Sequence, residues 1–241
     1  MKKKVLLATM FMCAATLFSS VAMASPAKDL RKPVTIENHT TQEGVFKCTY
    51  PIITNAQDSK ADTAINANIA EKIMLFTGPF NKTAKYGSPY PKIDAKIIHD
   101  KITGSVNYKL TCNANTIISL ILDKSVTVPH KDGKSYTLDM KDGLNYTKDG
   151  TILRAVDWSN MAKAVNMEDP FSKACLKKSV DAALQARGLT AVKGYEDDLT
   201  MAKDNYYIDG STNLHALYMP GMIAPESAGW FDVPLNMQLM K

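Results

Sequence analysis

The chain has 241 residues, 45% of them hydrophobic and 22% charged, which is enough for one large domain or two small ones. The formal net charge is +5, but three lysines lie within the first four residues, so the chain after residue 24 carries only +2. The longest basic runs after that point, Arg31-Lys32 and Lys177-Lys178, have two residues each. We set nucleic acid aside as a partner, because binding it needs a clustered basic face.

The first 24 residues have the pattern of an export signal. A basic start at Lys2–Lys4 precedes an apolar run at 5–18, and Ala22-Met23-Ala24 forms a small-residue cleavage site. The apolar run is too short to cross a hydrocarbon core that needs about 20 residues, so a retained anchor is the weaker alternative. We expect cleavage near Ala24 and an extracytoplasmic protein, periplasmic or secreted, with no integral membrane segment in the mature chain.

Three cysteines follow the signal, and export would place them where disulfides can form. Cys48 and Cys112 are expected on strands and are candidates for one disulfide, although the sequence does not show whether they approach each other. Cys175 lies beside Leu176 on an expected helix, where we expect a small buried hydrophobe. No C-x-x-C spacing indicates a redox dithiol or a zinc knuckle.

Two strands are expected near the start of the folded region. Residues 25–40 contain a polar leader and a candidate edge strand at 34–38. Residues 45–53 alternate between apolar and polar side chains, as a half-buried strand does. Pro51 has no backbone N–H, which indicates that this strand ends there or lies at a sheet edge.

The residues after Asp58 have the pattern of an amphipathic helix. Asp58 or Ser59 can cap its start, and apolar side chains recur at spacings of four and three. The members of this stripe are Ile65, Ile69, Ile73 and Phe76. Gly78-Pro79 is expected to end the helix, since proline interrupts helical hydrogen bonding, and 79–91 is expected to be a loop.

The next part of the chain is predicted to form a β-meander. Strands are expected at 93–102, 106–110, 116–128 and 136–140. Turns between and after them are indicated by Gly104, by Asn113-Ala114-Asn115 and by Asp-Gly pairs at 132–133, 142–143 and 149–150.

Two helices and a hairpin complete the chain. Asp157 is expected to cap a short helix at 158–165, and a longer helix is expected between Asp169-Pro170 and Arg187-Gly188. The hairpin is predicted from strands at 206–208 and 214–219 around an Asp-Gly turn. An irregular corner at 223–229 then leads to a closing strand at 231–235.

This order of elements predicts an α+β fold with a mostly antiparallel sheet, the meander plus the C-terminal hairpin, packed with two main helices. We expect a signal peptide at 1–24, a leader and candidate edge strand at 25–40, and a single domain at 41–241. Its two subregions are expected at about 41–128 and 129–241. No Gly-rich turn from a strand into a helix favours a doubly wound fold.

Motifs spread over roughly residues 40–235 resemble a known extracytoplasmic domain. They are Tyr50-Pro51, the Asn-rich helix from Ile65, Val106-Asn107-Tyr108, Ile118-Ser119-Leu120, Tyr206-Tyr207-Ile208, and Ile223-Ala224-Pro225 with Gly229. Together they are similar to the domain shared by RsiV-type anti-sigma factors and the N-terminal region of the peptidoglycan deacetylase PdaC. The resemblance implies a fold used at the cell envelope, in one relative to bind lysozyme.

The chain also departs from this family. The place of the family's Gly-Gly-Ala-His-like turn holds Thr127-Val128-Pro129-His130, so only His130 is retained. We expect neither a transmembrane helix after the signal nor a deacetylase domain. The signalling role of the first relative and the hydrolytic role of the second therefore do not carry over.

Residues with catalytic or metal-binding chemistry are few and scattered. His39, His99, His130 and His215 have no metal-ligand spacing such as H-E-x-x-H, so we expect no metal and no cofactor. The sequence has no G-x-S-x-G nucleophile elbow. Cys175 could form a thiol–imidazole pair with His130 or His215, but its place on an apolar helix face favours an inert thiol.

Aromatic and polar side chains gather in the C-terminal segment, a mixture that suits stacking on sugar rings or anchoring a protein partner. With the histidine that the resemblance retains, the binding candidates are His130, Asn213, His215, Tyr218, Glu226 and Trp230. The alternative is that alternate strand residues are core and the others ordinary surface, and that Glu226 caps nearby backbone amides.

These observations lead to two main hypotheses. The first is an exported, non-catalytic binding domain of the cell envelope that recognises a lysozyme-like protein or a cell-wall glycan such as peptidoglycan. The second is a hydrolase of envelope polymers whose active site is assembled from distant residues around His130 or His215. A role in structural assembly is a third.

Overall fold

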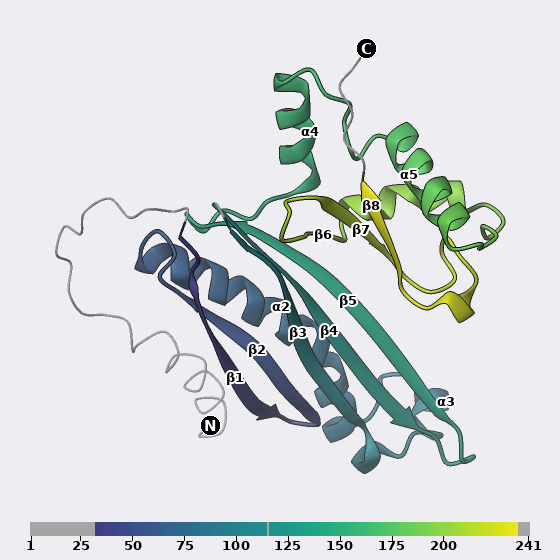
Figure 1. The fold of residues 1–241 in the computed structure, drawn as a ribbon. Helices are drawn as coiled ribbons and strands as arrows, with labels where there is room; N and C mark the ends of the chain where they lie inside the picture. The colour runs from purple at the N-terminus through teal and green to yellow at the C-terminus, as the bar shows by residue number, and fades with distance from the viewer. Residues whose placement is uncertain (1–31, 115, 236–241) are drawn as a thin grey trace.

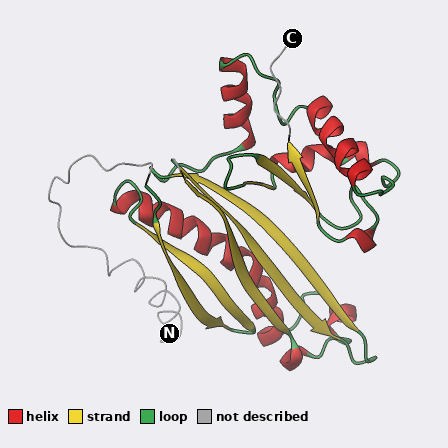
Figure 2. Cartoon of the chain, in the orientation of Figure 1, coloured by secondary structure: helices red, strands yellow, loops and turns green. Residues whose placement is uncertain are grey.

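The computed structural model describes residues 32–114 and 116–235 of the chain. The expected signal peptide and the first residues of the expected leader lie outside this part. Two β-sheets and several helices form an α+β fold (Figure 1, Figure 2), so the predicted fold class is confirmed. No helix of the described residues is both long enough and apolar enough to cross a membrane.

The larger sheet has five strands in the spatial order β1-β2-β3-β4-β5. The strands are β1 (Thr35–Glu43), β2 (Phe46–Thr54), β3 (Thr103–Ala114), β4 (Ile117–Pro129) and β5 (Ser135–Thr147). Neighbours pair antiparallel except β2 and β3, which run parallel where Phe46–Cys48 meets Gly104–Val106. The helix-containing crossover between β2 and β3 permits this parallel pair.

Pro51 lies within β2 rather than at its end, and the backbone geometry explains why it is tolerated. The N–H and C=O of Ile53 both point away from β1, because each bonds the Asn66 side chain at 2.8 Å. Pro51 comes two residues earlier, so its nitrogen points to the same side. β3 does not pair with this part of β2, and the missing N–H therefore leaves no ladder bond unmade.

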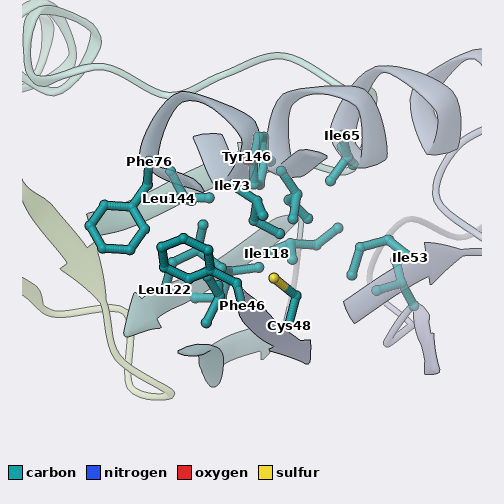
Figure 3. Close-up of a cluster of buried hydrophobic side chains, with 14 of the residues drawn as sticks. Phe46, Cys48, Ile53, Ile65, Ile73, Phe76, Ile118, Leu122, Leu144 and Tyr146 are labelled. Atoms are coloured by element: carbon teal, nitrogen blue, oxygen red, sulfur yellow. The ribbon is translucent and has the colours of Figure 1, made fainter. Parts of the chain in front are cut away.

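One face of the larger sheet is covered by α2 (Ser59–Tyr86), whose start is capped by Asp58. The Asp58 carboxylate accepts hydrogen bonds from the backbone N–H groups of Lys60 and Ala61, both at 2.9 Å. The predicted helix stripe is buried against the sheet. Figure 3 shows side chains of α2 facing strand side chains of this first hydrophobic core, among them Phe46, Cys48, Leu122 and Leu144.

The prediction that Gly78-Pro79 ends this helix is wrong, because α2 continues to Tyr86. The apolar stripe goes on with Phe80 and Ala84, which pack against the same core. Pro79 has no N–H to donate to the carbonyl of Leu75, four residues earlier. Both residues are exposed, so water can replace the missing hydrogen bond. Packing of the additional turns against the core outweighs the cost of the proline.

The segment between α2 and β3 contains the short helix α3 (Pro91–Asp94) and the 3-10 turn η1 (His99–Lys101). The strand predicted at 93–102 is therefore wrong. Pro91 occupies the start of α3, where a proline ring is already set for the helical backbone. The Asp94 carboxylate then accepts a hydrogen bond from the backbone N–H of Ser88, which fixes the preceding loop.

The remaining elements form a smaller layer beside the larger sheet (Figure 1). Its helices are α4 (Ala155–Ala164) and α5 (Lys173–Ala186), with the 3-10 turns η2 (Tyr195–Asp197), η3 (Leu199–Lys203) and η4 (Glu226–Ala228). Its strands β6 (Tyr206–Ile208), β7 (Leu214–Tyr218) and β8 (Phe231–Leu235) pair antiparallel in chain order. The predicted hairpin and closing strand are confirmed.

A second hydrophobic core lies between the three-stranded sheet, α5 and η3. It contains strand residues of one alternating face together with helix residues, among them Tyr206, Ile208, Leu214, Ala216, Tyr218, Leu176, Val180 and Leu199. Ser172 caps α5 by accepting a hydrogen bond from the Cys175 N–H at 3.2 Å, whereas Asp169 was the predicted cap. The first core includes Leu144 and Tyr146 of β5, and the second includes Cys112 of β3, so the two cores do not separate at a single point in the chain.

The two layers are joined where β6 crosses the larger sheet. Ser119 on β4 accepts a hydrogen bond from the Ile208 N–H at 2.9 Å, and Asn145 on β5 donates to the Tyr206 carbonyl at 2.8 Å. Ser119 also donates to Asn145 at 2.7 Å. Gly143 permits this approach, since a Cβ there would lie 1.8 Å from the Tyr206 carbonyl oxygen. The Asp-Gly pair at 142–143 is thus part of β5, and the turn predicted there is wrong.

Candidate functional site

The face of the three-stranded sheet that points away from the second core carries a hydrogen-bonded group, here called the His215 cluster: Tyr207, Asp209, His215 and Asp232. His215 Nδ1 lies 2.9 Å from Asp232 Oδ1, and His215 Nε2 lies 3.3 Å from Asp209 Oδ2. The Tyr207 hydroxyl donates to Asp232 Oδ2 at 2.7 Å. Both ring nitrogens of His215 therefore face carboxylates of the same chain.

Strand register places these side chains together. Tyr207 on β6 lies directly opposite His215 on β7, and their rings stack with centroids 4.7 Å apart and an interplanar angle of 20°. Asp232 projects from β8 on the same face. Asp209 sits in the turn after β6, where it accepts hydrogen bonds from the N–H groups of Ser211 and Asn213. The cluster thus connects all three strands.

Electrostatics in the cluster favour the charged forms of its members. Hydrogen bonding to Asp232 raises the pKa of His215 above its usual value, against the opposing effect of burial. The pKa of Asp209 is lowered, chiefly by the hydrogen bond from the Asn213 side chain. Burial alone would raise the pKa of Asp232, but hydrogen bonds from His215 and Tyr207 outweigh it and lower that pKa. His215 therefore acts as a cross-link between two carboxylates, with no ring nitrogen left to take a proton from a substrate.

The other C-terminal candidates do not form one exposed surface with His215. Tyr218 is fully buried, and its hydroxyl donates to the Leu199 carbonyl at 3.0 Å. Asn213 is exposed in the turn, where its side-chain amide donates to Asp209 at 3.0 Å. Only Asn213 thus joins the His215 cluster, and Tyr218 is core, as the alternative interpretation of the strand predicts.

Glu226 and Trp230 lie beyond the hairpin. Glu226 is exposed at the start of η4. Trp230 is half-buried against a small apolar group of Ile121, Tyr207 and Leu217, which lies between the two sheets. The Trp230 indole N–H is buried without a hydrogen-bond partner in the described part of the chain. Trp230 therefore packs against the junction between the sheets.

Cys48, Cys112 and Cys175 are all buried, and Cys48 and Cys112 are not bonded to each other, so the candidate Cys48–Cys112 disulfide is not formed. Cys48 lies opposite Val106, and Cys112 is six residues further along β3, about 20 Å at the usual rise of a strand. A bulge between Leu110 and Cys112 also turns Cys112 into the second core, whereas Cys48 lies in the first. Burial raises the pKa of Cys48 to about 12 and raises the pKa of the other two thiols, which makes them poor nucleophiles.

His130 lies far from the C-terminal candidates, at the turn between β4 and β5. Together with the end of α2 and the segment around α3, this turn forms a surface that we call the tip surface, residues 82–101 and 129–138 (Figure 1). It exposes three tyrosines, with exposed fractions of 74% for Tyr86, 66% for Tyr90 and 55% for Tyr136. The Tyr136 ring contacts that of His130, with centroids 4.5 Å apart. The tip surface is therefore the part of the described chain where tyrosine rings face solvent.

Backbone hydrogen bonds hold the segments of the tip surface together. The N–H of Ile98 donates to the Pro129 carbonyl at 2.9 Å, and the N–H of Lys131 donates to the Lys96 carbonyl at 2.8 Å. The Lys131 ammonium adds a bond to the Ala95 carbonyl at 2.9 Å. The tyrosines thus stand on a fixed platform rather than on free loops.

Sequence reasoning located His130 but missed the tyrosines around it, because 79–91 was interpreted as a connecting loop. A signal was present: Tyr86-Gly87-Ser88-Pro89-Tyr90-Pro91 places two aromatic residues in a stretch rich in turn residues. Such a stretch exposes its aromatic side chains, since loops run over the surface and hold few core positions.

Across 32–114 and 116–235, no three or more His, Cys, Asp or Glu side chains are placed to hold a metal ion together. The carboxylates that lie within ion-pair distance of a described histidine are Asp209 and Asp232 beside His215 and Asp94 beside His99. Each of them also accepts a hydrogen bond from another group of the chain.

No known protein family and no curated protein matches the sequence. The fold is similar to that of a DUF3298 family member from Bacteroides fragilis NCTC 9343, with a TM-score of 0.56, 11% identity, and coverage of 84% of this chain and 90% of that one. A DUF3298 family protein from Pseudomonas aeruginosa PAO1 gives a TM-score of 0.49 at 12% identity, covering 86% and 92% of the two chains. The structural neighbours are thus members of a family of unknown function, and at these identities the likeness concerns the fold alone.

Proposed function

We propose that this protein is an exported, non-catalytic binding domain of the cell envelope, and that it recognises cell-wall glycan through the tip surface. The observation that carries the proposal is the exposure of Tyr86, Tyr90 and Tyr136 on one hydrogen-bonded platform. The predicted export signal and the resemblance to an envelope domain support a location at the cell envelope. RsiV-like or PdaC-like membership remains part of the proposal.

The chemistry of exposed tyrosine suits this ligand. A tyrosine ring offers an apolar face for the C–H side of a sugar ring and a hydroxyl for its polar edge. Aromatic side chains also bring large contact area at low conformational cost. Because the tip segments are already joined by hydrogen bonds, binding need not order them, which leaves more of the contact energy for affinity.

The rival hydrolase hypothesis needs a histidine that is free to move a proton. His215 has both nitrogens against carboxylates, and His130 has no carboxylate or nucleophile bonded to its ring among the described residues. These contacts support binding over catalysis. The binding hypothesis also includes a lysozyme-like protein as a ligand. The test therefore measures binding to lysozyme as the alternative.

The test compares binding of the purified protein, starting at Ser25, to isolated peptidoglycan and to lysozyme. A variant with Tyr86, Tyr90 and Tyr136 changed to Ala should bind peptidoglycan at least about tenfold more weakly, since buried aromatic anchors contribute on the order of 1 kcal/mol or more each. The matched control changes Leu75, Met161 and Met201 to Ala, three exposed apolar residues outside the tip surface.

The control should bind like the original protein. Equal binding by the tyrosine variant, or no binding of peptidoglycan at all, would remove the proposal. Binding to lysozyme that survives the tyrosine changes would place recognition on another surface and favour the protein partner.

A further inference from the structure

The tip surface carries more positive charge than the rest of the chain. It contains seven lysines and three aspartates, a net charge of +4, whereas all residues after 24 together carry only +2. All of these lysines are exposed: Lys82, Lys85, Lys92, Lys96, Lys101, Lys131 and Lys134. The remainder of the chain is therefore net negative, and the fold separates charge that the composition averages out.

These lysines have no acidic partners within the described residues, whereas Lys124, Lys141 and Lys177 elsewhere do. Lys141 pairs with Asp123 at 2.7 Å on the larger sheet, and Lys177 pairs with Asp181 at 2.9 Å on α5. At the tip, by contrast, Asp94 pairs with His99 at 3.1 Å and Asp132 accepts a hydrogen bond from the Lys134 backbone. Two of the three aspartates of the tip surface are thus engaged with groups other than a lysine ammonium.

Each exposed tyrosine of the tip surface lies within two residues of a lysine in the sequence. Lys85 adjoins Tyr86, and its ammonium lies 4.8 Å from the centre of that ring. Lys92 comes two residues after Tyr90, and Lys134 two residues before Tyr136. A ring that stacks on any of the three tyrosines would therefore lie within reach of a lysine from the same segment.

We infer that the tip surface binds an acidic polysaccharide, a chain of sugar rings that bear carboxylate or phosphate groups. The inference rests on the proposed function and narrows it to one class of glycan. Stacking on the tyrosines accounts for the sugar rings, and charge complementarity with seven unpaired lysines accounts for the anionic groups.

An anionic membrane surface fits the same charge less well. Interfacial binding uses an amphipathic helix with a continuous exposed apolar face. The tip contains α3, which has only four residues, and the last turns of α2, whose apolar stripe packs against the first core. The exposed tyrosines are instead spread over two separate parts of the chain, each beside a lysine.

The experiment measures affinity for four probes: an oligogalacturonate, a neutral chito-oligosaccharide of the same length, inorganic polyphosphate, and phosphatidylglycerol vesicles. The oligogalacturonate should bind most tightly, and its affinity should fall at least about tenfold between about 50 mM and 500 mM salt. Changing Lys92, Lys96 and Lys134 to Gln should weaken its binding by a similar factor. The matched control changes Lys163, Lys193 and Lys203, exposed lysines on other elements, to Gln and should leave binding unchanged.

The outcomes separate this inference from the proposed function. Equal affinity for the neutral chain, with no effect of the lysine changes, would overturn the acidic ligand while leaving a glycan-binding tip. Polyphosphate or vesicles bound more tightly than oligogalacturonate, with no effect of the tyrosine changes, would overturn both. If the lysine changes and the tyrosine changes each weaken oligogalacturonate binding, the result would support both the acidic ligand and the glycan-binding tip surface.

Discussion

Two histidine–tyrosine pairs lie in different parts of this molecule, and their surroundings give them different roles. The rings of Tyr207 and His215 stack at 4.7 Å, and those of His130 and Tyr136 are 4.5 Å apart. In the first pair, both imidazole nitrogens and the tyrosine hydroxyl are bonded to carboxylates. In the second pair, no hydrogen bond from either ring to another described residue is present, and Tyr136 is exposed.

The difference shows that residue type alone does not mark a binding site. The His215 cluster satisfies its own polar groups, so it stabilises the three-stranded sheet and offers little to a ligand. The tip surface leaves aromatic faces and ammonium groups in contact with water, where a ligand can use them. Mutations in the His215 cluster should therefore change the stability of the protein, whereas mutations in the tip surface should change its binding to a ligand.

The largest effect on stability is expected at the junction between the two sheets, where β6 packs directly on β5. Gly143→Ala would place a Cβ 1.8 Å from the Tyr206 carbonyl oxygen, so β6 must shift away from Ser119 and Asn145. We expect the free energy of unfolding to fall by about 3 kcal/mol, measured by chemical denaturation.

Gly78→Ala is the matched control for this change. Gly78 lies within α2, and a Cβ there would meet nothing within 4 Å. Because alanine has the higher helix propensity, this variant should gain about 0.5–1 kcal/mol. Equal stability of the two variants would contradict the described junction between the sheets.

The His215 cluster should make stability depend on pH. The folded-state pKa of His215 is raised from 6.5, so its contribution is complete at pH values below 6.5 and is lost as the pH rises through the folded value. The pKa values of Asp209 and Asp232 are lowered from 3.8, so their contribution is present above 3.8 and lost as the pH falls through the folded values. Stability should therefore be greatest between pH 3.8 and 6.5.

Thermal unfolding measured from pH 5 to pH 9 tests this dependence. We expect a loss on the order of 1 kcal/mol or less across this range, because Asp209 and Asp232 are partly exposed and solvent screens the interaction. His215→Gln removes the titrating group and should flatten the profile. A profile that keeps its slope in that variant would assign the pH dependence to other residues.

The smallest effect on stability is expected at the tip surface. Tyr86→Ala, Tyr90→Ala and Tyr136→Ala should each change the free energy of unfolding by no more than about 0.5 kcal/mol, because these rings are exposed and bury little apolar surface. Denaturation curves of the single variants provide the measurement. A loss of several kcal/mol in any of them would show that the tyrosine belongs to the core.

Local patterns predicted much of the fold. The alternation and Asp-Gly turn of the last segment gave the hairpin β6-β7, and the isoleucine stripe gave α2. Two turn signals misled for physical reasons. Pro79 is tolerated because Phe80 and Ala84 continue the buried stripe, and Gly143 sits in mid-strand because the Tyr206 backbone packs over it. The second contact joins residues far apart in the chain, which no local pattern encodes.

The candidate site was predictable only in part. Tyr218 is one of the binding candidates, but it lies on the same face of β7 as Leu214 and Ala216 and is buried in the second core, which is the outcome of the alternative interpretation. His130 was assigned to binding, but its neighbours at the tip come from a segment about 40 residues earlier in the chain. The tip lysines are likewise scattered, so a search for basic runs does not find the surface that the fold assembles.

The most direct test of the account is to map amide NMR shifts while soluble peptidoglycan fragments are added to the labelled protein. We expect the perturbed amides to be confined to residues 86–96 and 130–138. Perturbations centred on 206–218, with the tip unchanged, would contradict it and assign recognition to the three-stranded sheet.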